Sequence, residues 1–312
     1  MWLPTGALDS IRRQVQSSVQ RAVDGQLVPE ETWSEPAGDP GLFGPGSVTW
    51  TVHADLPAML VGGLSALLLQ TLHPLAMAGV ADHSSFRQDP LGRLRRTAAF
   101  VGVTTFGSTS AAERAIAAVR RVHRAVHGTA PDGRPYDAND PDLLTWVHTA
   151  EVSSFLRAYR RYGPRWLGAA HVDRYFAETA VVARALGARA VPQSAAEVRA
   201  YLRQVRPQLV AGPQALAAAA FVVNGPGPAA FGQPLEDVGR GVLVQAAIDL
   251  LPRWARAELR LREPLPGERF TLHRALNAAF AALRLMLGPN EVVQAAMARA
   301  RSTDPDQLGV TA

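Results

Sequence analysis

Residues 67–97, LLLQTLHPLAMAGVADHSSFRQDPLGRLRRT, decide the fold class of this chain. They continue an apolar run, starting near residue 48, that has the composition of a buried helix. Residues 118–128, AVRRVHRAVHG, and 133–155, GRPYDANDPDLLTWVHTAEVSSF, add further helical segments. Five of the eight histidines lie between residues 73 and 151, mostly on or beside apolar helix faces. A buried imidazole needs a partner, so this stretch is where we expect the functional site.

Helical periodicity extends along the whole chain. It predicts helices at residues 7–23, 48–72, 90–106, 108–128, 141–160, 170–186, 195–206, 213–222, 236–251, 253–262 and 270–287. Alternating strand patterns, a Rossmann glycine motif and a P-loop are absent from the sequence. We therefore predict an all-α fold with an N-terminal helix and connector (1–47), a main helical domain (48–290) and a C-terminal helix and tail (291–312).

The composition is that of a globular protein. Of the 312 residues, 47% are hydrophobic and 19% are charged, which is too little charge for a disordered chain. The net charge of +5 comes from arginine alone, and the arginines are spread in pairs over many helices. This spread favours solvated helix faces over a nucleic-acid site. The absence of cysteine excludes thiolate metal sites and thiol nucleophiles, and no G-x-S-x-G motif supports a hydrolase.

No targeting or membrane-spanning segment is expected. The start, MWLPTGALDSIRRQVQ, lacks a basic region followed by an apolar one, so we predict no signal peptide. The apolar run at residues 56–80 is interrupted by Gln70, Thr71, His73 and Pro74, and its unbroken part is too short for a bilayer span. We expect a cytoplasmic protein without an integral membrane segment, for which peripheral association with a membrane stays open.

His123 and His127 are the first candidate ligands. They lie four residues apart in one predicted helix and would share a face. The sequence HRAVH lacks the glutamate of a zinc-protease helix. Val119, Val122 and Val126 surround His123, which is therefore the more buried candidate. The alternative is a structural imidazole bonded to a backbone carbonyl.

A second set of candidates lies on two other helices. His148 is followed three residues later by Glu151, so the carboxylate can orient the imidazole or share a metal with it. Too few glutamates face this helix for a di-iron site. Arg93 and Thr97 share a helix face that suits a propionate, an oxyanion or a polar substrate group, unless Arg93 pairs with Asp82 or Asp89. Arg96 points elsewhere on the same helix and is either distal to the site or exposed.

These three segments, taken together, resemble the mpaB-type oxygenase family, whose catalytic domain is shared with the rubber-cleaving latex-clearing proteins. The resemblance is specific over residues 73–160. It implies a globin-like helical core, a b-type haem with one neutral histidine as iron ligand, and dioxygen on the other side. His123 matches the ligand, and Arg93 and Thr97 match residues that flank the haem. Arg96 stands where some members have a distal lysine, and this chain has no lysine.

The resulting expectation is a haem b-dependent oxygenase that uses O₂ on a hydrophobic substrate such as an isoprenoid. His123 would ligate the iron. Arg93 and Thr97 would position a propionate or bound oxygen, with Arg96 and His148 in supporting positions. The apolar helix 56–72 would line the pocket, and a reductase partner stays open. The alternatives are a helical protein that binds lipid or haem without catalysis, and a non-haem metal enzyme with His123, His127 and His148 as ligands.

Overall fold

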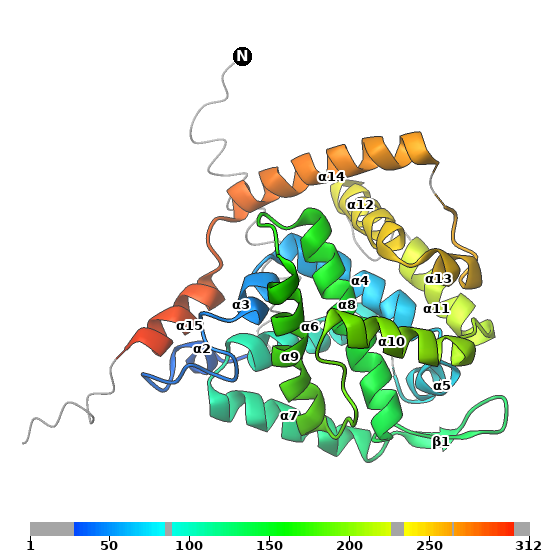
Figure 1. Ribbon diagram of the computed structural model, residues 1–312, viewed down its shortest axis with the longest axis horizontal. Helices are drawn as coiled ribbons and strands as arrows, with labels where there is room; N and C mark the ends of the chain where they lie inside the picture. Colours follow the sequence, from blue (N-terminus) through cyan, green and yellow to red (C-terminus); the bar gives the residue numbers. More distant parts are fainter. Residues whose placement is uncertain (1–27, 85–88, 226–233, 264, 303–312) are drawn as a thin grey trace, which may run out of the picture.

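The computed structural model describes residues 28–84, 89–225, 234–263 and 265–302. It confirms the predicted all-α class (Figure 1). The helices are α2 (Glu31–Ser34), α3 (Val48–His53), α4 (Leu56–Gln70), α5 (Pro74–His83), α6 (Pro90–Phe106), α7 (Thr109–His123), α8 (Pro141–Tyr162), α9 (Ala169–Leu186), α10 (Ala195–Val205), the 3₁₀ turn η1 (Arg206–Gln208), α11 (Pro213–Asn224), α12 (Pro234–Leu250), α13 (Arg253–Glu258), α14 (Pro266–Leu287) and α15 (Glu291–Arg301). The predicted helix 7–23 lies outside the described residues.

The core is built on the packing of α4 along α8, with α12 against the other side of α4. Gly62 of α4 permits this close approach, because a Cβ there would lie only 2.9 Å from the Cα of Phe155 in α8. Trp146 and Tyr159 of α8 are almost fully buried, as are Leu68 and other side chains of α4. These two helices form the centre of the core, and the other helices pack around them.

The apolar run that the sequence predicts as one helix, 48–72, is two helices. The chain breaks after Ala54, and the Asp55 carboxylate caps α4 by accepting a hydrogen bond from Ala58 N at 3.0 Å. Asp55 is also paired with Arg284 of α14, whose Nε donates to Oδ2 at 2.7 Å. An aspartate with two such partners starts a new helix at a position that hydrophobicity alone does not mark.

From the sequence, Pro74 either kinks the apolar helix or begins the next one, and the structure has the second arrangement, with α5 starting at Pro74. The axes of α4 and α5 meet at 105° across this step. Among the described residues no single helix has the length and apolar composition of a membrane span, and α4 and α5 reach that composition only when counted together across the bend. Helix α5 continues to His83, so Asp82 and His83 are helical and not in a loop as the sequence indicates.

The predicted helix that ends at Gly128 stops five residues earlier. Helix α7 ends at His123, and a short antiparallel hairpin follows, with β1 (His127–Thr129) paired to β2 (Pro135–Asp137). The strands are joined by a turn at Asp132 and Gly133, a dipeptide typical of turns, and Gly133 has a positive φ of 84°. His123 and His127 therefore lie on different elements and share no helix face.

The connector before α3 is fixed to the body by two of its aromatic side chains, Trp33 and Phe43. Both pack against a cluster that contains Trp50 of α3 and Phe106 of α6. Arg299 of α15 is 2% exposed and donates hydrogen bonds only to backbone carbonyls of the connector and of the end of α6. Arg299 thereby links the C-terminal helix α15 to the connector near the start of the described chain.

Candidate functional site

A small cavity that is partly open to the surface, which we call the histidine cavity, lies between α3, α6, α8 and α9. Its volume is about 40 Å³, which is room for a few water molecules at roughly 10–15 Å³ each. The lining side chains are mostly apolar, with a small number of polar groups among them: Phe43, His53, Phe100, Val101, Thr104, Thr105, His148, Glu151, Val152, Phe155, Thr179 and Val182. Buried titratable groups in an apolar cavity are the usual mark of a functional site.

His148 contributes an imidazole that lacks a partner on one side. Its Nε2 is buried and makes no hydrogen bond within the described part of the chain. Burial lowers the pKa of His148 from 6.5 to about 4, with a smaller contribution from Arg184. The ring is therefore neutral near pH 7, and its free nitrogen can bind a metal or accept a proton.

Glu151 lies one helical turn beyond His148 and lines the same cavity. Burial raises the pKa of its carboxyl from 4.5 to about 7. No hydrogen bond or ion pair to Glu151 is formed by the residues described. The sequence predicted that Glu151 can orient His148, and the spacing does bring both side chains to one cavity, but no hydrogen bond joins them.

His53 of α3 completes the polar lining and was not expected from the sequence. Its Nδ1 is 2.8 Å from Thr105 Oγ1 and its Nε2 is 2.9 Å from Tyr175 Oη. Burial lowers the pKa of His53 to about 3. Both ring nitrogens are thus occupied by neutral partners. The partners come from α6 and α9, and no local motif around residue 53 signals them.

His123 lies at the end of α7, apart from the cavity lining. It is half-buried, its Nδ1 is buried without a partner among the described residues, and burial lowers its pKa. Its predicted apolar surroundings are only partly present, because Val122 is 63% exposed. His127 is exposed on β1. The expectation that His123 is the more buried of the pair agrees with this placement.

Arg93, Thr97 and Arg96 lie on the first half of α6. Arg93 Nη1 donates to Ser84 Oγ at 2.5 Å, and burial lowers the pKa of its guanidinium. Thr97 is exposed, and its hydroxyl donates to Arg93 O at 3.1 Å. Arg96 is exposed and paired with Asp89 at 3.3 Å. The sequence offered an ion pair of Arg93 with Asp82 or Asp89 as an alternative. In the structure it is Arg96, about one helical turn further on, that pairs with Asp89.

The face of α6 that lines the cavity continues toward these residues. Thr104, Phe100, Thr97 and Arg93 follow one another at spacings of three or four residues, which places them on one side of a helix. Thr104 and Phe100 line the cavity. A ligand longer than the present cavity would meet Thr97 and then Arg93 if it extended along α6.

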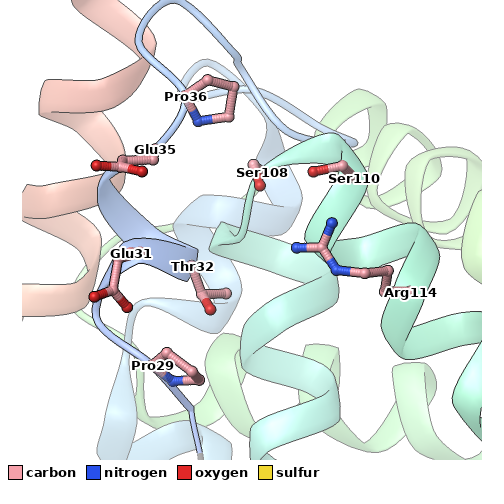
Figure 2. Close-up of a pocket in the computed structure, with 8 residues that line it drawn as sticks. All are labelled: Pro29, Glu31, Thr32, Glu35, Pro36, Ser108, Ser110 and Arg114. Atoms are coloured by element: carbon pink, nitrogen blue, oxygen red, sulfur yellow. The ribbon is translucent and has the colours of Figure 1, made fainter.

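Two other features lie outside this cavity: a side-chain cluster with a structural role and a surface groove. Tyr136 of β2 donates to Asp82 Oδ2 at 2.6 Å and is 3.1 Å from His83 Nε2, which joins the hairpin to α5. An adjacent carboxylate and imidazole could act as a general base, but here Tyr136 occupies both groups. A groove of about 360 Å³ lies between the connector and α7, with Glu31 and Arg114 on opposite sides (Figure 2). Most of its lining is exposed and it lies apart from the histidine cavity.

Comparison with protein families gives one match. Residues 50–284 match the model of the family described as ER-bound oxygenase mpaB/B'/Rubber oxygenase, catalytic domain. The chain belongs to this family. No curated protein and no solved structure gives a significant match. The matched residues run from α3 to the last turn of α14, so the cavity lies within the oxygenase domain.

The haem implied by resemblance to the mpaB and rubber oxygenase family can be tested against this geometry. The donor chemistry fits: among the described residues, three histidines keep a buried ring nitrogen without a partner, namely His73, His123 and His148, and burial lowers the pKa of each. Arg93 is a half-buried cation. The space does not fit. A cavity of about 40 Å³ is far below the roughly 300–1,000 Å³ of ligand and cofactor pockets. The described residues therefore supply ligand groups that suit a haem, but this cavity does not supply the room for one.

Proposed function

We propose that this protein is an oxygenase that binds haem b and uses O₂ on a hydrophobic substrate such as an isoprenoid chain. Family membership supports the oxygenase chemistry. The donor set supports the cofactor. Within the described residues no three His, Asp or Glu side chains converge on a possible metal position. Non-haem iron needs several protein ligands, whereas haem iron needs as little as one imidazole because the porphyrin supplies the others.

We assign the iron ligand to His123, the position that the family resemblance implies. Ligation requires a neutral imidazole with a free nitrogen, and the lowered pKa and unpartnered Nδ1 of His123 meet both conditions. His148 is assigned a supporting role next to the bound group. Its own free Nε2 makes it a competing ligand, and the buried, unpartnered Nδ1 of His73 makes that residue another, so the histidines need separate tests.

The remaining roles follow from position on α6 and α8. Arg93 and Thr97 are assigned to a propionate or to the polar end of the substrate, with the apolar lining of the cavity around the hydrocarbon part. Arg96 can join them only by exchanging its ion pair with Asp89. The bound haem would supply the oxygen activation. The protein's contribution is to orient the ligands, exclude water and hold a proton at Glu151 near neutral pH.

Iron and porphyrin content, measured with oxygen uptake, tests this proposal against its alternatives. After loading with haemin, we expect iron and porphyrin in equal amounts, and oxygen uptake when a reductant and a polyisoprenoid lipid are added. Iron without porphyrin would support a non-haem metal enzyme. Bound haem without oxygen uptake would support a haem- or lipid-binding protein. A protein that retains neither iron nor porphyrin would refute the cofactor assignment.

A further inference from the structure

The connection between α8 and α9 carries a tryptophan that is almost completely in solvent. Trp166 is 86% exposed, the highest fraction among the large apolar side chains described. Three exposed arginines surround it in the sequence, namely Arg160 and Arg161 in the last turn of α8 and Arg165. We call these four residues the α8–α9 corner. Isolated apolar side chains are common on surfaces, but a large aromatic ring among cations is a recognition feature.

The positive charge of the α8–α9 corner is not neutralised by carboxylates. Residues 152–172 contain no aspartate or glutamate. Among the described residues no ion pair reaches Arg160, Arg161 or Arg165. Arg161 instead lies over the ring of Tyr162, at 5.8 Å from its centre. The corner is therefore both cationic and aromatic, and it is open to an anionic partner.

The C-terminal half of helix α14 packs next to this corner (Figure 1). The ring of Tyr162 meets that of Phe280 at 5.3 Å, and Arg284 Nη2 donates to Tyr162 O at 2.5 Å. Leu285, in the last turn of α14 beside Arg284, is 80% exposed. Leu265 and Phe270, which are 62% and 64% exposed, lie at the opposite end of this helix. The other large apolar side chains exposed in the described chain, apart from Trp166, are all valines.

We propose that the α8–α9 corner docks the protein on a bilayer surface that carries anionic headgroups. Tryptophan is favoured at the level of the headgroups, and arginines near the surface are attracted to anionic lipid. Single-stranded nucleic acid also accepts arginines and a stacking ring. Leu285, on the adjoining end of α14, favours lipid, because an aliphatic side chain offers no ring for a base to stack on. This proposal does not depend on the proposed oxygenase activity.

Sedimentation of the full chain with vesicles tests the proposal. We expect binding to vesicles of phosphatidylcholine with phosphatidylglycerol, weaker binding at high salt, and little binding to phosphatidylcholine alone. The triple variant R160S/R161S/R165S should lower the partition coefficient by roughly 100-fold. A matched control removes three exposed arginines elsewhere, R189S/R199S/R203S, and should change it by less than about tenfold. W166A should lower it by roughly tenfold.

Several outcomes would overturn this docking surface. The first is that the wild-type protein does not bind anionic vesicles. The second is that the two triple variants lose vesicle binding equally, and the third is that the protein binds a single-stranded RNA more tightly than vesicles. A fluorescent label gives a second test, in which the expected result is a shift of the emission spectrum and not a loss of binding. The chain has no cysteine, so W166C can be labelled at one site. An environment-sensitive dye at this position should shift to the blue with anionic vesicles, whereas the same dye on S110C should not. Equal shifts at both positions, or none, would contradict the proposal.

Discussion

The wild-type protein should become less stable as the pH rises, because the carboxyl of Glu151 then loses its proton. Replacing Glu151 by glutamine should remove this pH-dependent loss of stability. Burial raises the pKa of this carboxyl from 4.5 to about 7, so the folded state holds the proton more tightly than the unfolded chain does. The stabilisation by the bound proton is complete below pH 4.5 and is lost as the pH rises through 7. Each tenfold change in proton affinity corresponds to about 1.4 kcal/mol, so the loss is about 3 kcal/mol in total. Glutamine mimics the neutral carboxyl and should avoid it.

Urea unfolding of wild type and E151Q over a range of pH measures this effect. The free energy of unfolding of E151Q minus that of wild type should rise by about 2–3 kcal/mol between about pH 5 and pH 8. Contributions from the buried histidines cancel in this difference because both proteins contain them. E113Q, at an exposed position of α7, is the matched control and should show a flat difference. A difference for E151Q that is constant with pH would refute the neutral, buried carboxyl.

Two further predictions concern residues that hold separate segments of the chain together, and urea unfolding measures both. G62A should lower the free energy of unfolding by about 1–3 kcal/mol, because the new methyl group would overlap Phe155. G63A should be neutral or stabilising, since its nearest neighbour is 3.9 Å away, and equal losses in both variants would contradict the close approach of α4 and α8. R299M should cost about 3 kcal/mol in urea unfolding, because several buried carbonyls lose their donor. Stability unchanged in R299M would show that these carbonyls find other partners.

Helix starts were predictable because they depend on neighbouring residues. Asp89 with Pro90 and Asp140 with Pro141 each place a capping carboxylate before a proline, and α6 and α8 begin there. The spacing of His148 and Glu151 on α8 likewise predicted that they share a face. In each case the information lies within one helical turn.

The features that the sequence did not predict depend on distant partners. Helix α7 ends at His123 because the next residues pair with β2, and this pairing overrides a continuous apolar pattern. The break at Asp55 is held by Arg284, 229 residues away. His53 reaches the cavity through partners on two other helices. None of these contacts has a local signature.

The absorption spectrum of the protein after addition of haem tests the central claim, that a histidine of this core holds an iron porphyrin. We expect an intense Soret band in the wild type, its loss or marked shift in H123A, and an unchanged spectrum in H127A, the exposed histidine four residues further on. A shift in H148A with none in H123A would move the ligand to the cavity. A colourless wild type after haem addition would contradict the claim itself.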